Sequence, residues 1–177
     1  MPKPLVFNST PLIYLTKVSL TQLFIQIHVE NITTSRVYQE TVVQGKKKGA
    51  PEALLLEGLF KKKVISIYEP KDKKFVKTLI RIVAGLEQQP LHEAEAEVLA
   101  VANEVNGIAL IDDKAARSVA VLFGIESHGT GYVLGRIHLN SKIGKEKLIH
   151  KIREMREAGW YVSAEDYLDI IKYIESL

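Results

Sequence analysis

Short apolar runs separated by segments with helical spacing constrain the fold of this chain more than any other feature. Leu5–Phe7 and Ile108–Ile111 are apolar at every position, and polar residues follow directly, Asn8 after the first run and Asp112-Asp113 after the second. Continuous apolar runs of this length predict strands that are buried on both faces. Because such strands alternate with helical segments, we expect an α/β protein with a parallel sheet between helices. Ligands bind such sheets at the carboxyl ends of the strands, where Asn8 and Asp112-Asp113 are expected.

Apolar spacing and chain-breaking residues set the expected boundaries of the remaining elements. Two further strands are expected at residues 27–32 and 64–68. Helices are expected at 12–20, from about 36 onward, and at 52–60, 75–84, 91–105, 115–123, 132–139, 145–158 and from 163. Ser9 or Thr10 is expected to cap the first helix, with Pro11 at its first position. Residues 127–131 are predicted to form a glycine-rich turn.

The length of 177 residues suits one domain with one sizeable core. We expect a single domain over residues 1–177, in which residues from about 140 to 177 form a helical extension packed on the rest. No apolar run approaches the ~18 residues of a membrane span, and the first residues do not resemble a signal peptide. These features predict a cytoplasmic protein without a membrane partner. Because the chain has no cysteine, any metal must bind to oxygen or imidazole ligands.

Basic and acidic residues occupy separate blocks of the chain, although the net charge is only +3. Residues 45–81 contain eleven Lys or Arg and four acids, whereas residues 82–113 contain seven acids and no Lys or Arg. A solvated helical surface would explain either block alone. Their juxtaposition suggests a basic track for an anionic polymer next to an acidic pocket for a metal.

The candidate site consists of oxygen ligands from four expected elements: Asn8, Glu40, Glu93, Glu97, Asp112 and Asp113. Glu93 and Glu97 are four residues apart, so they share one helix face and repel each other. A hard cation would offset that repulsion, which favours Mg²⁺ or Mn²⁺. The chemistry implied is metal-assisted hydrolysis of a phosphodiester.

Each of these residues also has a purely structural interpretation. A single Glu on a helix, such as Glu40, Glu95 or Glu97, most often only faces solvent. Asp112-Asp113 is a stronger signal, but Asp is also a common helix cap, and one of the pair could cap the helix that carries Arg117. The sequence leaves open which of the two would bind a metal.

Four segments in order resemble the motifs of the PIN-domain family, and in particular its prokaryotic branch of toxins from toxin–antitoxin pairs. They are VFNSTPLIYL at 6–15, HEAEAEVLA at 92–100, LIDDKAAR at 110–117 and GIESHGTGYVL at 124–134. The closing segment AGWYVSAEDYLDIIK is also similar to that branch. The resemblance therefore covers nearly the whole chain.

This resemblance implies a three-layer α/β/α fold with a parallel sheet of about five strands, Mg²⁺ or Mn²⁺ bound by acidic residues, and endoribonuclease activity. It also implies RNA as substrate, an antitoxin protein as partner and a homodimer. The family's first acid corresponds to Asn8, its second to Glu40 and its third to Glu93. Its fourth corresponds to Asp112 or Asp113. The supporting residues of the family correspond to Ser9, Thr10 and Arg117.

Two positions depart from the family pattern. His92 stands where this branch usually has Gly. It is interpreted as a surface residue or as a partner of the metal ligands, and only as a minor candidate for a ligand itself. Asn8 stands in place of the first Asp, and its amide oxygen can bind a hard metal but carries no charge and cannot act as a base. The alternative to an active enzyme is therefore a catalytically weakened module that binds RNA or a protein partner. A nucleotide-binding protein is disfavoured because the sequence has no GxxxxGK[ST] or GxGxxG motif.

Overall fold

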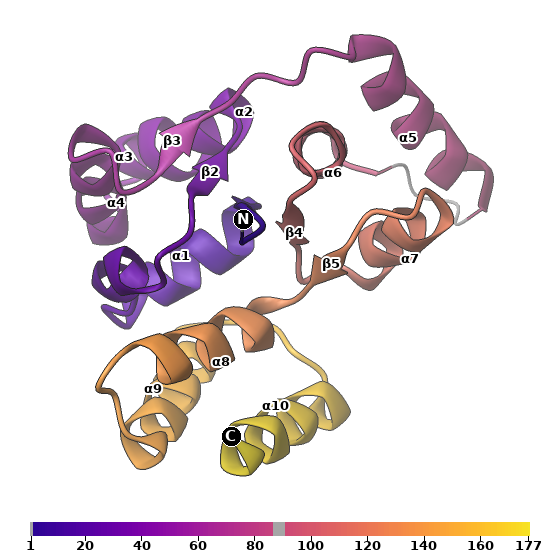
Figure 1. Cartoon of the computed structure of the whole chain (residues 1–177). Coiled ribbons are helices and arrows are strands. Elements are labelled where there is room, and N and C mark those ends of the chain that lie inside the picture. The colour runs from indigo at the N-terminus through magenta and orange to yellow at the C-terminus, as the bar shows by residue number, and fades with distance from the viewer. Residues whose placement is uncertain (1, 87–90) are drawn as a thin grey trace.

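The computed structural model describes residues 2–86 and 91–177. Its centre is a sheet of five parallel strands in the order β3-β2-β1-β4-β5 (Figure 1). The strands are short: β1 (Leu5–Phe7), β2 (Asn31–Thr33), β3 (Ser66–Ile67), β4 (Ile108–Leu110) and β5 (Ser127–His128). β1 is the central strand, and it pairs with β2 on one side and β4 on the other. The parallel sheet predicted from the apolar runs is thus confirmed.

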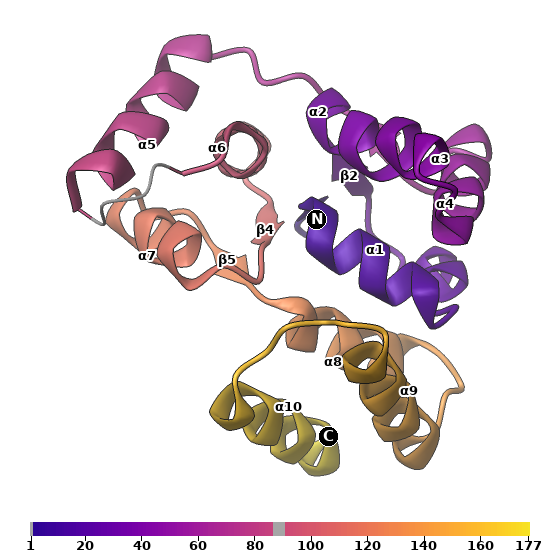
Figure 2. The ribbon, with the colours of Figure 1, turned by 180° about the vertical axis from the view of Figure 1, so that it is seen from behind.

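Helices cover both faces of this sheet, which gives three layers. Figures 1 and 2 show the first group on one side and the second on the other. The first group consists of α1 (Ser9–Lys17), the 3₁₀ helix η1 (Thr21–Gln26), α2 (Ser35–Tyr38), the π-helical segment η2 (Gln39–Gln44), α3 (Gly45–Lys47) and α4 (Pro51–Lys61). The second consists of α5 (Lys73–Leu86), α6 (Glu93–Glu104) and α7 (Lys114–Leu122). The expected α/β/α fold is confirmed.

Three C-terminal helices form a separate group beside the sheet, drawn in orange and yellow in Figure 1. They are α8 (Thr130–Asn140), α9 (Lys145–Glu157) and α10 (Ala164–Ser176). α8 contacts both α9 and α10, and α9 also contacts α1. Gly131 and Gly135 lie where α8 meets α10, so close that an added Cβ would meet Ile170 and Tyr173.

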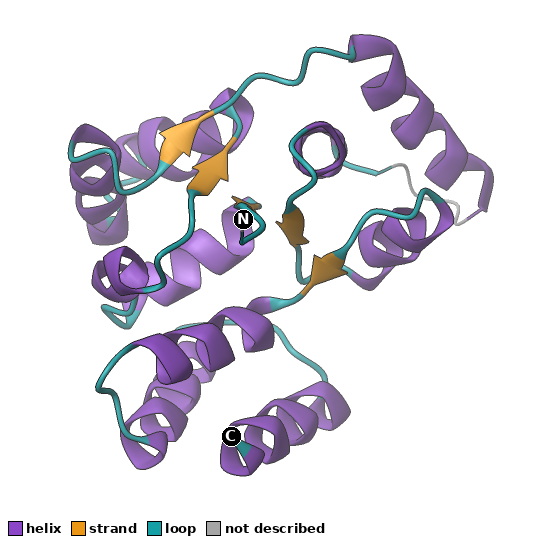
Figure 3. Ribbon diagram, viewed as in Figure 1, coloured by secondary structure: helices purple, strands orange, loops and turns teal. Residues whose placement is uncertain are grey.

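Two predicted elements differ from the structure, as the distribution of helix, strand and loop in Figure 3 shows. Residues 27–32 were expected to be one strand, but the chain completes η1 first and pairs only from Asn31. His28 has a φ of 56°, which is incompatible with an extended strand. Ser127 and His128 were expected in a turn but form β5, which pairs with Ala109 and Leu110 of β4. A strand of two residues has no periodicity from which it could be predicted.

The cap of the first helix also differs from the prediction. Asn8 is the N-cap residue of α1, and Ser9 and Thr10 lie inside the helix. Thr34 is the N-cap of α2, and its hydroxyl accepts a hydrogen bond from the Val37 amide. Among the described residues, no helix is long and apolar enough to cross a membrane.

Candidate functional site

Asn8 lies at the carboxyl end of the central strand, where β1 gives way to α1. Its backbone amide donates to the Leu110 carbonyl at 3.0 Å, which holds it against the end of β4. The residue is only 7% exposed, and its side chain makes no capping hydrogen bond to α1. The side-chain amide of Asn8 is thus buried at this edge without capping the helix, and it is available to bind a ligand.

Glu40 reaches the same edge from the helical layer above β2. It belongs to η2, where the chain is wound in π-helical rather than α-helical form, a feature that is frequent at functional sites. The Ser9 hydroxyl donates a hydrogen bond to the Glu40 carboxylate. Ser9 therefore connects Glu40 to the first residue of α1, next to Asn8.

Asp112 and Asp113 have different partners. Asp113 is the N-cap of α7, and its Oδ1 accepts a hydrogen bond from the Ala116 amide at 2.8 Å. Asp112 accepts three hydrogen bonds: Thr130 N to Oδ1 at 2.6 Å, Thr130 Oγ1 to Oδ2 at 2.8 Å and Trp160 Nε1 to Oδ2 at 2.9 Å. Both oxygens of Asp112 are thus engaged, whereas the second oxygen of Asp113 has no protein donor in the described part of the chain.

Glu93 and Glu97 are paired with Arg36 rather than left to repel each other. Arg36 Nη2 lies 2.7 Å from Glu93 Oε2, and Arg36 Nε lies 3.4 Å from Glu97 Oε1. The argument that a metal must offset their repulsion therefore no longer applies, because a guanidinium group does so. Neither residue lines the cavity described below, and the side chain of Glu93 is 60% exposed.

Glu95, which lies between them on α6, faces the site instead. It lines the cavity together with Asn8 and Asp113. Its Oε2 accepts a hydrogen bond from the backbone amide of His92, which is the N-cap of α6. The sequence signal for Glu95 was its helical phase: two residues along a helix turn a side chain about 200° away, so Glu95 cannot share the face of Glu93 and Glu97.

The electrostatics of Glu95 show which carboxylates lie near one another. Burial raises the pKa of the Glu95 carboxyl group, and the negative charges of Asp113 and Glu40 raise it further. Three acids from three elements, η2, α6 and the start of α7, thus act on one another at this edge of the sheet. Of the predicted residues, Asn8, Asp112 and Asp113 line one cavity, as does Glu95, and Glu40 is connected to this group through Ser9.

A cavity of about 1030 Å³ opens from this acidic edge. Asn8, Glu95, Asp112 and Asp113 line it, together with residues of α7, β5, α8, α10 and the segment Gly159–Ser163. Thr10 lines it as well. Arg117 fixes the loop that follows β4 and carries Asp112 and Asp113, because its Nη1 donates to the carbonyls of Ile111 at 2.9 Å and Asp112 at 2.6 Å.

The donor chemistry fits a hard divalent cation, since every candidate ligand offers a carboxylate or amide oxygen. Within residues 2–86 and 91–177, no three Asp, Glu or His side chains converge closely enough to form a metal-binding group. The acids surround the site without meeting at a common point. Burial and the charges of Asp113 and Glu40 raise the pKa of Glu95, and a bound cation would offset that repulsion between the charges.

The fold and this site define a parallel α/β protein with oxygen ligands gathered at the carboxyl edge of its sheet. The family model described as PIN domain matches residues 4–176, so the chain belongs to the PIN-domain family. PIN domains are in general nucleases that depend on divalent metal ions. No curated protein matches the chain.

Proposed function

We propose that this protein is a metal-dependent endoribonuclease, in which Glu40, Glu95 and Asp113 hold Mg²⁺ or Mn²⁺ and the Asn8 amide oxygen completes the ligand set. The proposal rests on one observation: Asn8, Glu95 and Asp113 line the same cavity, and the Ser9 hydroxyl next to Asn8 holds Glu40 beside them. It assigns to Glu95 the role that the sequence suggested for Glu93. The family membership and the resemblance of the sequence motifs support RNA as the substrate.

The chain's own residues would bind and orient the scissile phosphate group. A bound metal supplies an activated water and neutralises the charge that develops on the phosphate. Ser9 fixes Glu40, the α7 N-terminus fixes Asp113, and the N-terminal turn of α6 fixes Glu95. Asp112 plays a positioning part, since its contacts with Thr130 and Trp160 hold the loop that carries Asp113.

The second candidate function is a weakened module that binds RNA or a protein partner. Asn8 favours it, because the amide leaves the ligand set one negative charge short of an Asp at this position. The toxin role, an antitoxin partner, a homodimer and a cytoplasmic location rest on the resemblance or on composition, and they remain predictions.

Cleavage of an RNA panel in the presence of Mn²⁺ tests the proposal. Asp113→Asn and Glu95→Gln should each reduce cleavage about 100-fold or more, as expected when a group that stabilises the transition state is lost. Glu93→Gln is the matched control, since it makes the same chemical change on the same helix outside the cavity, and it should leave cleavage within about twofold. Asn8→Asp should increase the rate, because it restores a negative charge to the ligand set.

An Asn8→Asp variant that remains inactive with both Mn²⁺ and Mg²⁺ would contradict the ribonuclease proposal. An equal loss of cleavage in Glu93→Gln and Glu95→Gln would contradict only the assignment of Glu95 as a ligand. Salt-dependent RNA binding that EDTA does not change, without cleavage by any variant, would support the binding module instead.

A further inference from the structure

Aromatic side chains, together with Asp166 and Asp169 of α10, line the part of the cavity that we call its aromatic end. Tyr161 comes from the segment between α9 and α10, Tyr132 and His128 come from α8 and β5, and Tyr14 comes from α1. The rings of His128 and Tyr132 are stacked, with centroids 4.3 Å apart and planes inclined by 8°. These rings gather around one space from segments that are far apart in the sequence.

Tyr161 is the most exposed of the large hydrophobic and aromatic side chains, at 91%. Its backbone, by contrast, is fixed on both sides. Trp160 is buried and donates from Nε1 to Asp112, and the preceding Gly159 carbonyl accepts a hydrogen bond from the Tyr14 hydroxyl at 3.0 Å. After it, Ser163 caps α10. Tyr161 is therefore an exposed ring on a backbone segment, Gly159–Ser163, that is held in place on both sides, and the ring contributes little to the core.

A hydrogen bond connects the segment Gly159–Ser163 to the acidic side of the cavity. Asp112, which receives the Trp160 hydrogen bond, directly precedes Asp113 in the chain. A polynucleotide whose phosphate group lies at Asp113 and Glu95 would thus occupy a cavity that Tyr161 also lines. Aromatic side chains bind unpaired bases through their ring faces, and a base held in a duplex cannot present such a face.

We propose that the aromatic end of the cavity, with Tyr161 as its main platform, binds an unpaired nucleobase of the substrate strand. The inference deepens the proposed function and rests on it for the identity of the strand. It gives the segment between α9 and α10 a role in recognition. Acidic side chains at this end, including Asp169, disfavour a second phosphate group there.

Binding without cleavage tests the platform separately from the catalytic site. The probes are a fluorescein-labelled oligoadenylate RNA, a ribose-phosphate oligomer of the same length without bases, and the oligoadenylate in a duplex. All are measured by anisotropy in EDTA. The natural protein should bind the oligoadenylate about tenfold more tightly than the base-free oligomer or the duplex, the range expected for one base stacked on an aromatic ring.

The variants then assign this preference to Tyr161. Tyr161→Ala should lose about tenfold in affinity for the oligoadenylate and little for the base-free oligomer, and Tyr161→Phe should retain most of the affinity. Leu168→Ala is the matched control, because Leu168 is an exposed residue of α10 that does not line the cavity. It should bind like the natural protein.

The outcomes separate this inference from the ribonuclease proposal. Equal binding of the oligoadenylate by Tyr161→Ala and the natural protein would overturn the platform, and so would equal binding of the strands with and without bases. If these differences appear but no variant cleaves RNA, the platform stands and the ribonuclease proposal fails. An oligodeoxyadenylate that binds as well as the RNA would extend the substrate class to single-stranded DNA.

Discussion

At the scale of single residues, Arg36 explains a pattern that the sequence alone suggested was a metal site. Its guanidinium bridges Glu93 on the surface and Glu97, which is only 8% exposed. Glu97 Oε2 has no hydrogen-bond partner among the described residues. Arg36 lies four residues before Glu40 on the same helical stretch, so the ion pairs also fix the helix that carries a candidate ligand against α6.

Removal of Arg36 should therefore destabilise the protein by leaving the Glu97 carboxylate nearly buried without a counter-charge. We expect Arg36→Met to reduce the free energy of unfolding by about 1–2 kcal/mol, less than for a fully buried pair because Arg36 is partly exposed. Urea denaturation measures the change. Lys62→Met, on the exposed end of α4, is the control and should change the stability by less than about 0.5 kcal/mol.

A double substitution checks the cause. Arg36→Met combined with Glu97→Gln removes the uncompensated charge, so part of the lost stability should return. If the double variant loses as much free energy of unfolding as the two single variants lose together, or more, the Arg36–Glu97 pair is not the source of the effect.

At the scale of elements, glycines in α8 permit close approach of α10. A Cβ built on Gly131 would lie 2.8 Å from Ile170 Cγ1, closer than unbonded carbon atoms come in folded proteins. α10 carries Ile170 on the side that faces α8, and its first turn follows directly from the segment that holds Tyr161. The α8–α10 contact therefore helps to set the position of the aromatic end of the cavity.

Substitution of Gly131 by Ala should push α10 away from α8. We expect Gly131→Ala to cost about 1 kcal/mol of stability, the lower end of the range for overpacking, because Ile170 is partly exposed and can shift. Thermal unfolding measures the change. Gly58→Ala is the matched control, since Gly58 lies inside α4 with nothing within 4 Å of an added Cβ. It should stabilise the protein by about 0.5 kcal/mol, and an equal gain in Gly131→Ala would contradict close packing.

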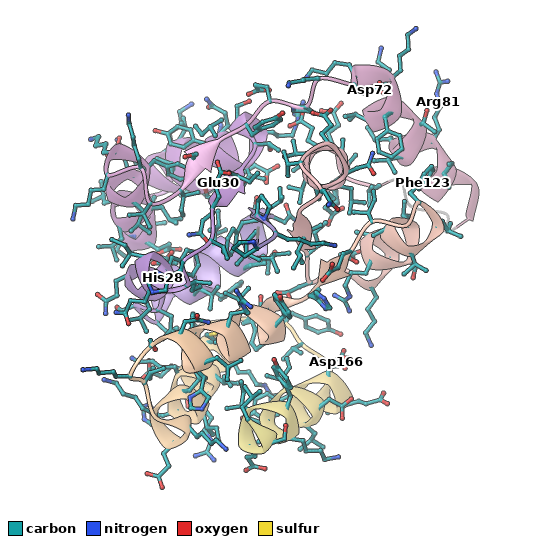
Figure 4. All side chains as sticks on the ribbon, viewed as in Figure 1. His28, Glu30, Asp72, Arg81, Phe123 and Asp166 are labelled. Carbon is teal, nitrogen blue, oxygen red and sulfur yellow. The ribbon has the colours of Figure 1, made fainter. Side chains whose placement is uncertain are left out.

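At the scale of the whole molecule, a few polar contacts join the C-terminal helices to the sheet. Trp160 reaches Asp112 at the end of β4, and Asp166 in the first turn of α10 lies 2.9 Å from Lys114 Nζ of α7. Figure 4 marks Asp166 at the end of α10 that is nearer to β5 and α7. The hydrogen bond from Ser163 and the contact with Lys114 hold the pKa of Asp166 below its ordinary value.

This lowered pKa predicts how acid affects the attachment of α10. A carboxyl group whose pKa is lower in the folded state contributes stability above its unfolded pKa, near 3.8, and loses it as the pH falls through the folded pKa. The natural protein should therefore be more stable than Asp166→Asn at neutral pH, and the difference should shrink below pH 3.8. Thermal unfolding over a pH series measures it. Asp169→Asn on the same helix is the control, and a difference independent of pH would contradict the prediction.

Much of the fold could be predicted because it follows from local patterns. Apolar runs identified β1 and β4, and helical spacing located most of the helices. β5 could not be predicted, because a two-residue strand exists only through its pairing with β4. The register of β2 could not be predicted either, since it depends on how η1 ends at His28.

The sequence by itself determined the fold class, the family and the edge of the sheet where polar residues gather, since each depends on residue order along single elements. Only the tertiary structure decided which carboxylates share that edge. Glu93, Glu95 and Glu97 are the same residue type on one helix. Their positions differ because Glu95 lies on the side of α6 that faces the cavity, whereas Glu93 and Glu97 pair with Arg36. The platform at Tyr161 is likewise a tertiary feature, because it depends on a hydrogen bond between residues 48 positions apart.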